Sequence, residues 1–182
     1  MKKSISKFIL YMMGWRIVGT IEYPKRCIII GAPHTSNWDF LIGRCYSYII
    51  GISPKYLIKK EWFVPLLAAF FRINGGIPVS RQEKNNLVEK ISDLYQRENF
   101  MLALSPEGTR SRVNKWKTGF YYIAMTAKVP IVLVKIDYRL KEVGVISEMV
   151  ASGNIEEDMI QIEKKFKNVI GKIPQNYNPK IF

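Results

Sequence analysis

The chain has 182 residues, of which 48% are hydrophobic and 24% are charged. These proportions exclude an intrinsically disordered protein and fit a single globular domain that buries about two-thirds of its unfolded surface. The 28 Lys and Arg residues outnumber the 15 Asp and Glu residues, which gives a formal net charge of +13. Such a charge favours an anionic partner: nucleic acid, an acidic membrane surface or a phosphorylated small molecule.

The N-terminal stretch MKKSISKFILYMMGW places lysines ahead of a short apolar run. No small-residue cleavage site follows, and the run is shorter than the ~18–20 apolar residues of a spanning helix. As a helix it would set Lys2, Lys3 and Lys7 beside an aromatic and methionine-rich surface, as in helices that lie in a membrane interface. It could instead pack on the protein's own core. We expect a membrane-interface segment at residues 1–20 and a second unit at residues 21–182.

From about residue 25, strand-like and helical stretches alternate. Strands are expected at residues 26–32, 55–60, 75–81, 100–105, 130–138 and 142–150. Helices are expected at residues 38–51, 61–73, 82–98, 119–129 and 154–170. Pro65 fits only the first turn of its helix, and Pro78 predicts an edge strand or the end of a strand. The alternation predicts a single layered α/β domain, with a mixed, mostly parallel sheet flanked by helices.

The two cysteines, Cys27 and Cys45, stand in apolar stretches without CxxC spacing. They are expected to be buried core residues in a reducing compartment. One histidine and one nearby aspartate supply too few ligands for a metal site. We therefore expect neither a metal nor a cofactor.

The stretch GAPHTSNWDF contains the only histidine, His34, and, after four intervening residues, Asp39. It follows an expected strand, and α/β domains bind ligands where their strands end. A neutral imidazole can take a proton from a hydroxyl while a nearby carboxylate fixes its tautomer. In a plainer interpretation, Asp39 complements a helix dipole and His34 is a solvated loop residue.

A second polar stretch, SPEGTRSR, also follows an expected strand. Gly108 permits close approach of the backbone to a ligand. Donors suited to a phosphate or a carboxylate come next: Thr109, Arg110 and Arg112. Glu107 does not fit a pure anion site and needs another role, such as pairing an arginine or accepting from a substrate hydroxyl. The stretch could equally be an exposed turn with solvated charges.

The stretch GGIPVSR ends in Arg81, which is either a second anion contact or a surface charge. The apolar stretch before it, WFVPLLAAFF, is either part of the core or the wall of an acyl pocket. Neither stretch decides between its two interpretations alone.

Taken in order, HTSNWD, GGIPVSR, SPEGTRS and VPIVLV resemble the four sequence blocks of the glycerolipid acyltransferase superfamily, which includes the 1-acylglycerol-3-phosphate acyltransferases. The likeness spans roughly residues 27–138. An HxxxxD motif alone is weakly specific, but HxxxxD followed by the G…R block and an intact EGTR is strongly specific. The chain looks like a short form that lacks a long membrane-embedded N-terminal hairpin.

The resemblance implies a role for each block. His34 would be the general base for the acceptor hydroxyl, oriented by Asp39. The freed oxygen would attack the thioester of acyl-CoA or acyl carrier protein directly, without an acyl-enzyme. The residues that would hold the acceptor's phosphate and glycerol are Arg81, Glu107, Gly108, Thr109 and Arg110. Lys59 or Lys60 would assist, and Pro130 would shape the floor of the site.

The implied product is phosphatidic acid, made from the lysophospholipid 1-acyl-sn-glycerol 3-phosphate. Pro78 stands where many members have an aromatic residue, a change that fits a different acceptor. Other lysophospholipids, or an amino-acid-based lyso-lipid, would use the same chemistry. The resemblance also implies a peripheral protein at the cytoplasmic face of the cell membrane.

The charge fits two non-catalytic classes as well, a nucleic-acid-binding protein and a membrane-surface module. The lysines are scattered and no RNP or zinc-finger signature occurs, so we expect no nucleic-acid partner. A membrane module would leave both motifs without a function. Substituting His34 by Ala separates these classes, because only an enzyme would lose turnover.

Overall fold

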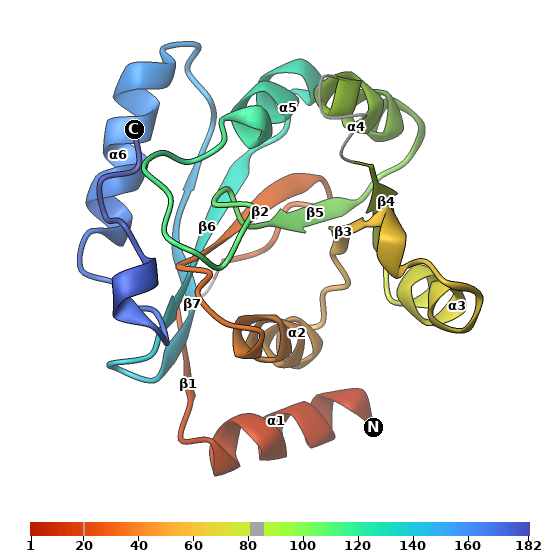
Figure 1. Ribbon diagram of the computed structural model, residues 1–182, viewed down its shortest axis with the longest axis vertical. Helices are drawn as coiled ribbons and strands as arrows, with labels where there is room; N and C mark the ends of the chain where they lie inside the picture. Colours follow the sequence, from red (N-terminus) through yellow and green to blue (C-terminus); the bar gives the residue numbers. More distant parts are fainter. Residues whose placement is uncertain (20, 81–85) are drawn as a thin grey trace.

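The computed structural model describes residues 1–19, 21–80 and 86–182. Within these ranges the chain forms a seven-stranded sheet flanked by helices (Figure 1). The strands are β1 (Arg16–Val18), β2 (Cys27–Ala32), β3 (Lys55–Lys59), β4 (Gly76–Val79), β5 (Met101–Leu104), β6 (Ile131–Asp137) and β7 (Glu142–Met149). The α-helices are α1 (Lys2–Met12), α2 (Trp38–Ile50), α3 (Pro65–Ile73), α4 (Leu87–Arg97), α5 (Gly119–Ala127) and α6 (Ile155–Phe166). Short 3-10 helices occur at η1 (Lys60–Trp62) and η3 (Pro174–Asn176).

The strand order is β1-β7-β6-β2-β5-β3-β4. Neighbouring strands are parallel except for β6 and β7, which pair antiparallel. This arrangement confirms the expected α/β domain with a mixed, mostly parallel sheet. Because β2, β3, β4, β5 and β6 run in one direction, their carboxyl ends share one edge of the sheet.

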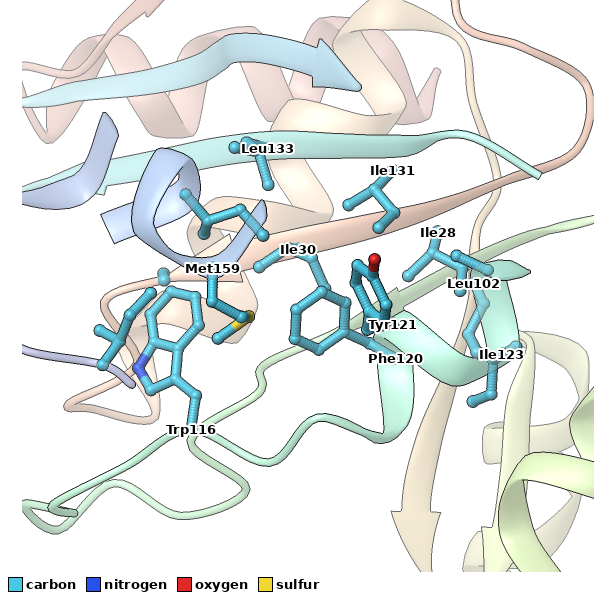
Figure 2. Close-up of a cluster of buried hydrophobic side chains, with 14 of the residues drawn as sticks. Ile28, Ile30, Leu102, Trp116, Phe120, Tyr121, Ile123, Ile131, Leu133 and Met159 are labelled. Atoms are coloured by element: carbon cyan, nitrogen blue, oxygen red, sulfur yellow. The ribbon is translucent and has the colours of Figure 1, made fainter. Parts of the chain in front are cut away.

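Each face of the sheet has its own core, because alternate residues of a strand point to opposite faces. Ile28 and Ile30 of β2 belong to a large cluster with α4, α5 and α6 (Figure 2). Cys27 and Ile29 belong to a smaller cluster with α1 and α2. We call these the α4–α6 face and the α1–α2 face. The helix α3 lies beside the edge strand β4 (Figure 1).

The expected strands are present as β2 to β7, and β4 lies at the sheet edge, which is one of the two positions that Pro78 predicted. The three-residue strand β1 was not predicted. It pairs with β7, so part of the segment at residues 1–20 joins the sheet. The division of the chain at residue 20 stays a proposal.

Several expected helices extend beyond the observed ones. The helix expected at residues 154–170 is α6, which ends at Phe166, and the one expected at residues 119–129 is α5, which ends at Ala127. The helix expected at residues 61–73 begins only at Pro65, because proline fits a first turn but cannot donate to a preceding one. The residues before it form η1 instead. The helix expected at residues 82–98 appears as α4, and residues 82–85 lie outside the described residues.

Candidate active site

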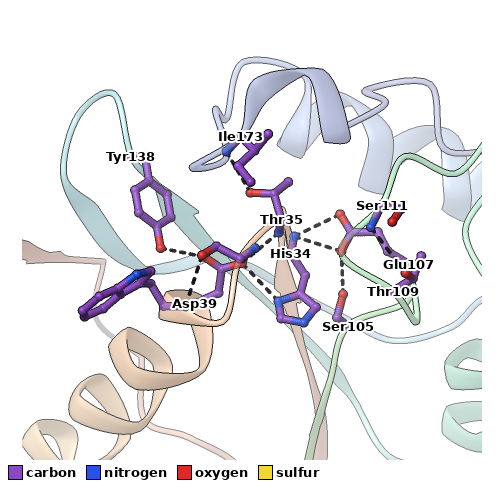
Figure 3. A network of polar contacts seen from close by, with 11 residues as sticks. His34, Thr35, Asp39, Ser105, Glu107, Thr109, Ser111, Tyr138 and Ile173 are labelled. Atoms are coloured by element: carbon purple, nitrogen blue, oxygen red, sulfur yellow. Dashed lines mark hydrogen bonds and ion pairs between the residues drawn. The ribbon is translucent and has the colours of Figure 1, made fainter.

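The two motif loops meet at the shared carboxyl edge of the sheet. β2 and β5 are direct neighbours, with Ile30 level with Leu104 near their ends. The chain continues from β2 into the loop that carries His34 and from β5 into the loop that carries Glu107. Motifs separated by about 70 residues therefore face one another, as the His34–Glu107 contact shows (Figure 3).

Asp39 holds the ring of His34. The distance from His34 Nδ1 to Asp39 Oδ2 is 3.1 Å. The same carboxylate oxygen accepts hydrogen bonds of 2.8 Å from the backbone N–H groups of Thr35 and Ser36. The other oxygen, Oδ1, accepts a 2.6 Å hydrogen bond from the Tyr138 hydroxyl (Figure 3). Asp39 thus stands in the first turn of α2, as the plainer interpretation expected, and also contacts the imidazole.

The pair has the asymmetry that a general base requires. The Asp39 side chain is 2% exposed, whereas that of His34 is 29% exposed. An ionised Asp39 accepts only, so Nδ1 is the protonated ring nitrogen and Nε2 keeps its lone pair. The partly exposed His34 ring can meet a hydroxyl while the aspartate stays away from solvent.

Glu107 joins the two loops. The backbone N–H of His34 donates to both carboxylate oxygens, at 2.9 and 3.1 Å, and the Ser105 hydroxyl donates at 2.5 Å. The residue is 5% exposed, and burial raises the pKa of its carboxyl against the opposite effect of these hydrogen bonds. Its partners are thus parts of this chain; the expected contact with a substrate stays a prediction.

The rest of the EGTR loop is open to solvent. Gly108 has a positive φ of 64°, and the space where a Cβ would stand is occupied by the Lys117 side chain. Thr109 and Arg110 are exposed. Arg112, by contrast, donates a 2.8 Å hydrogen bond to the carbonyl of Tyr177 and so fastens the C-terminal stretch. The loop therefore offers Arg110 and Lys117 as exposed cations.

Of the three remaining candidate residues, the structure describes the two lysines. Lys59 ends β3 and Lys60 begins η1, and both are exposed. Because β3 is parallel to β5, these lysines stand at the same sheet edge as the loop of Glu107. Arg81 lies outside the described residues, so its role stays a prediction.

An apolar cavity of about 230 Å³ opens at the pair. His34 and Asp39 line it, together with sheet residues such as Ile29 and Leu57 and with Phe40 and Gly43 of α2. It lies between α2 and the α1–α2 face of the sheet. None of the described side chains of the apolar stretch 62–71 lines this cavity, which argues against that stretch as the wall of the pocket.

Sequence reasoning missed three polar partners. Tyr138 follows β6, and its position at the carboxyl edge of the sheet was the available signal. Ser105 begins the SPEGTRSR stretch, where its residue type alone indicated no role. Thr35 lies within the HTSNWD stretch, and its Oγ1 accepts a 3.2 Å hydrogen bond from the backbone N–H of Ile173, 138 residues away.

Among the described residues, no group of three or more His, Cys, Asp or Glu side chains could hold a metal ion. Nor does any helix among these described residues have the length and apolar character to cross a bilayer.

A family model described as "Acyltransferase" matches residues 16–137. The chain is similar to a probable 1-acyl-sn-glycerol-3-phosphate acyltransferase of Mycoplasma pneumoniae, with 25% identity over 177 residues, 92% of this chain and 64% of that protein. It is also similar to the 1-acyl-sn-glycerol-3-phosphate acyltransferase of Haemophilus influenzae, with 29% identity over 117 residues, 60% of this chain and 47% of that protein. The chain thus spans between about half and two-thirds of the length of these relatives.

Among solved structures, the 1-acyl-sn-glycerophosphate acyltransferase PlsC from Thermotoga maritima superposes with a TM-score of 0.60 at 18% identity. The superposition covers 94% of this chain and 80% of that one. At this identity, the likeness confirms the fold.

Proposed function

Because the chain belongs to the acyltransferase family, we propose that it moves a fatty acyl group from an acyl thioester to the free hydroxyl of a lysophospholipid. The donor is acyl-CoA or acyl carrier protein. The acceptor favoured by the relatives' names is 1-acyl-sn-glycerol 3-phosphate, which gives phosphatidic acid. The observation that carries the proposal is a histidine, oriented by a buried aspartate, beside an apolar cavity.

In this mechanism His34 is the general base and Asp39 orients it. Nδ1–H donates to the Asp39 carboxylate, so Nε2 accepts the proton of the acceptor hydroxyl. The hydroxyl oxygen attacks the thioester carbonyl carbon, and the carbon–sulfur bond breaks as the ester carbonyl re-forms. The departing thiolate takes the proton from Nε2, which restores the neutral imidazole.

The cavity is proposed to take the acyl chain. Its walls are mainly apolar, and His34 lies on its lining, so a chain inside it could present its thioester to the base. Among the described residues that line the cavity, Arg44 carries the only guanidinium, which donates a 2.8 Å hydrogen bond to the Tyr48 hydroxyl and lies 4.8 Å from the centre of that ring. Burial of an acyl chain there would contribute about 0.8 kcal/mol per methylene.

The acceptor's phosphate is proposed to bind at the carboxyl edge of the sheet. The residues assigned to it are Arg81, Gly108, Thr109, Arg110, Lys59 and Lys60, with Glu107 supporting the loop. The exposed guanidinium of Arg110 is suited to bidentate phosphate binding. Lys117, which lies across Gly108, adds a further positive charge.

We further propose that the protein binds peripherally at the cytoplasmic face of the membrane. On the helix α1 the exposed fraction is between 53% and 79% for four apolar or aromatic residues: Ile5, Phe8, Tyr11 and Met12. A second apolar surface surrounds α3, where the exposed side chains are Trp62, Val64, Leu67, Phe70 and Ile73. Lysines flank both surfaces, and each positive charge near an anionic bilayer contributes up to about 1 kcal/mol to the free energy of binding.

An assay of the purified protein with lipid vesicles tests the proposal. Acyl-CoA and acyl carrier protein would be offered with 1-acyl-sn-glycerol 3-phosphate and a panel of other lyso-lipids, beside His34→Ala and Asp39→Asn. We expect phosphatidic acid from the wild type only, with vesicle binding unchanged in both variants. Acylation of another panel member would keep the mechanism and change the acceptor. A folded, vesicle-bound wild type that acylates nothing would favour a non-catalytic membrane module.

A further inference from the structure

We infer that Tyr138 is a positioning residue, which fixes the Asp39 carboxylate and through it the ring of His34. The catalytic consequence rests on the proposed function, whereas the effect on the imidazole does not. Tyr138 lies just after β6, and its hydroxyl points to Asp39 across the carboxyl edge of the sheet (Figure 3).

The two oxygens of Asp39 have separate partners. Oδ2 accepts from the His34 ring and from the backbone N–H groups of Thr35 and Ser36. Oδ1 accepts from the Tyr138 hydroxyl at 2.6 Å, and no other hydrogen bond to Oδ1 occurs within residues 1–19, 21–80 and 86–182. Without this hydroxyl, a carboxylate with 2% exposure would carry one unsatisfied oxygen, which favours rotation of the group.

Tyr138 is suited to be a permanent donor. Burial, together with its hydrogen bond to Asp39, raises the pKa of the phenol above its ordinary value, so the hydroxyl keeps its proton throughout the neutral range. A hydroxyl donating to a carboxylate makes a short, charge-assisted bond, in agreement with the 2.6 Å distance.

Tyr138 is itself held through its backbone and through its ring. Its backbone N–H donates a 2.8 Å hydrogen bond to the carbonyl of Ile170. Its ring meets that of Trp15 edge-on, with centroids 4.9 Å apart and planes at 89°. Trp15 is 6% exposed and stands three residues after the end of α1, and its backbone N–H donates a hydrogen bond to the carbonyl of Leu10. The segment at residues 1–20 therefore reaches the catalytic pair through Trp15.

A second tyrosine–aspartate pair in the chain provides a matched control. On the α4–α6 face, the Tyr121 hydroxyl donates to Asp158 Oδ2 at 2.8 Å, and both residues are buried. This bond has the same chemistry but does not involve His34. Tyr121→Phe therefore measures the structural cost of losing such a bond, and Tyr138→Phe measures that cost plus any effect on the imidazole.

The first readout uses the fact that His34 is the only histidine of the chain. A long-range ¹H–¹⁵N spectrum of labelled full-length protein then reports one imidazole, and its nitrogen shifts give the tautomer. We expect the Nδ1–H tautomer in the wild type and in Tyr121→Phe. We expect a clear rise in the Nε2–H tautomer in Tyr138→Phe. An unchanged spectrum in folded Tyr138→Phe would overturn the inference.

Thermal unfolding of each variant establishes that the proteins compared are folded. If Tyr138→Phe does not fold, Trp15→Leu decides, because it keeps the hydroxyl and removes the ring contact that aims it. We expect a smaller change of tautomer in the same direction. A wild-type spectrum in Trp15→Leu would then count against the inference.

The second readout is turnover with the acceptor on which the wild type acts. Tyr138→Phe should lower kcat about ten- to a hundredfold with KM unchanged, since it displaces the base and leaves the substrate contacts in place. Tyr121→Phe should retain wild-type kcat. Equal kcat in the two variants would overturn the positioning role. A wild type inactive on every acceptor would instead reject the proposed function, and the imidazole spectrum would still decide the inference.

Discussion

On the α4–α6 face of the sheet, Met159, Ile162 and Phe166 of α6 are completely buried, whereas on the α1–α2 face Phe40 and Leu41 of α2 leave 48% and 36% of their surfaces exposed. The first face is a continuous core (Figure 2). The second contains the cavity beside His34 and a smaller cluster. We infer that packing on one face supplies most of the stability, which allows the other face to keep space for a ligand.

The largest expected difference between the faces is in stability. Phe166→Ala should lower the free energy of unfolding by about 3–5 kcal/mol, because it empties a fully buried site against Trp116. Phe40→Ala should cost about 1 kcal/mol or less, because half of that side chain is already in water. Denaturant unfolding measures both, and equal losses would show that the faces contribute alike.

The next effect is on membrane binding. Phe70→Ser combined with Ile73→Ser should weaken binding to anionic vesicles by about tenfold or more, because burying such a side chain is worth about 1.5–3 kcal/mol. The controls are Val150→Ser and Ile160→Ser, which change exposed apolar residues away from α3. Cosedimentation with vesicles measures the binding. A loss of similar size in the controls would remove α3 from the proposed membrane surface.

A smaller effect is expected within α2. Gly43 lines the cavity, and an added Cβ there would meet no atom within 4 Å. Gly43→Ala should raise the free energy of unfolding by about 0.5–1 kcal/mol, because alanine lowers the entropy of the unfolded chain. It should also reduce the use of long acyl donors relative to short ones. Stabilisation without a change in donor preference would place the acyl chain elsewhere.

The smallest expected effect is a change in the free energy of unfolding with pH, caused by the Glu107 carboxyl. Burial raises the pKa of Glu107, so the folded protein keeps this proton where the unfolded chain, with an ordinary pKa of about 4.3, has lost it. The stability from this shift is present below that value and is lost as the pH rises through the folded pKa. The wild type should therefore lose stability relative to Glu107→Gln as the pH rises from about 4. Urea unfolding at a series of pH values measures the free energy of unfolding of both proteins. If the pKa of Glu107 is not raised, the two plots of this free energy against pH will be parallel.

Strands with continuous apolar sequence were predictable, because a central strand is covered on both faces. The stretch at Cys27 and the stretch at Ile131 show this pattern and became β2 and β6. The strand β1 has three residues, two of them exposed, so its sequence shows no apolar run or alternation that would predict a strand. It exists because β7 offers it a partner edge.

The motifs of the site were predictable as motifs, but their partners were not. The offset of five residues placed Asp39 within reach of His34, as the local backbone allows. Glu107 accepts a hydrogen bond from the backbone N–H of His34, 73 positions away. Tyr138 donates one to the carboxylate of Asp39, 99 positions away. Such contacts depend on the order of the strands in the sheet, which local periodicity does not contain.

The pairing of β1 with β7 also sets the order in which the protein can be completed during synthesis. Arg16 lies beside Glu142, 126 residues later in the chain. A ribosome adds about 5–20 residues per second, so β1 waits several seconds or more for its partner strand. During that time α1, with its exposed Phe8 and Tyr11, is not yet fastened to the sheet through β1. We expect the helix to be free to contact a bilayer before the proposed acyl-transfer site has formed.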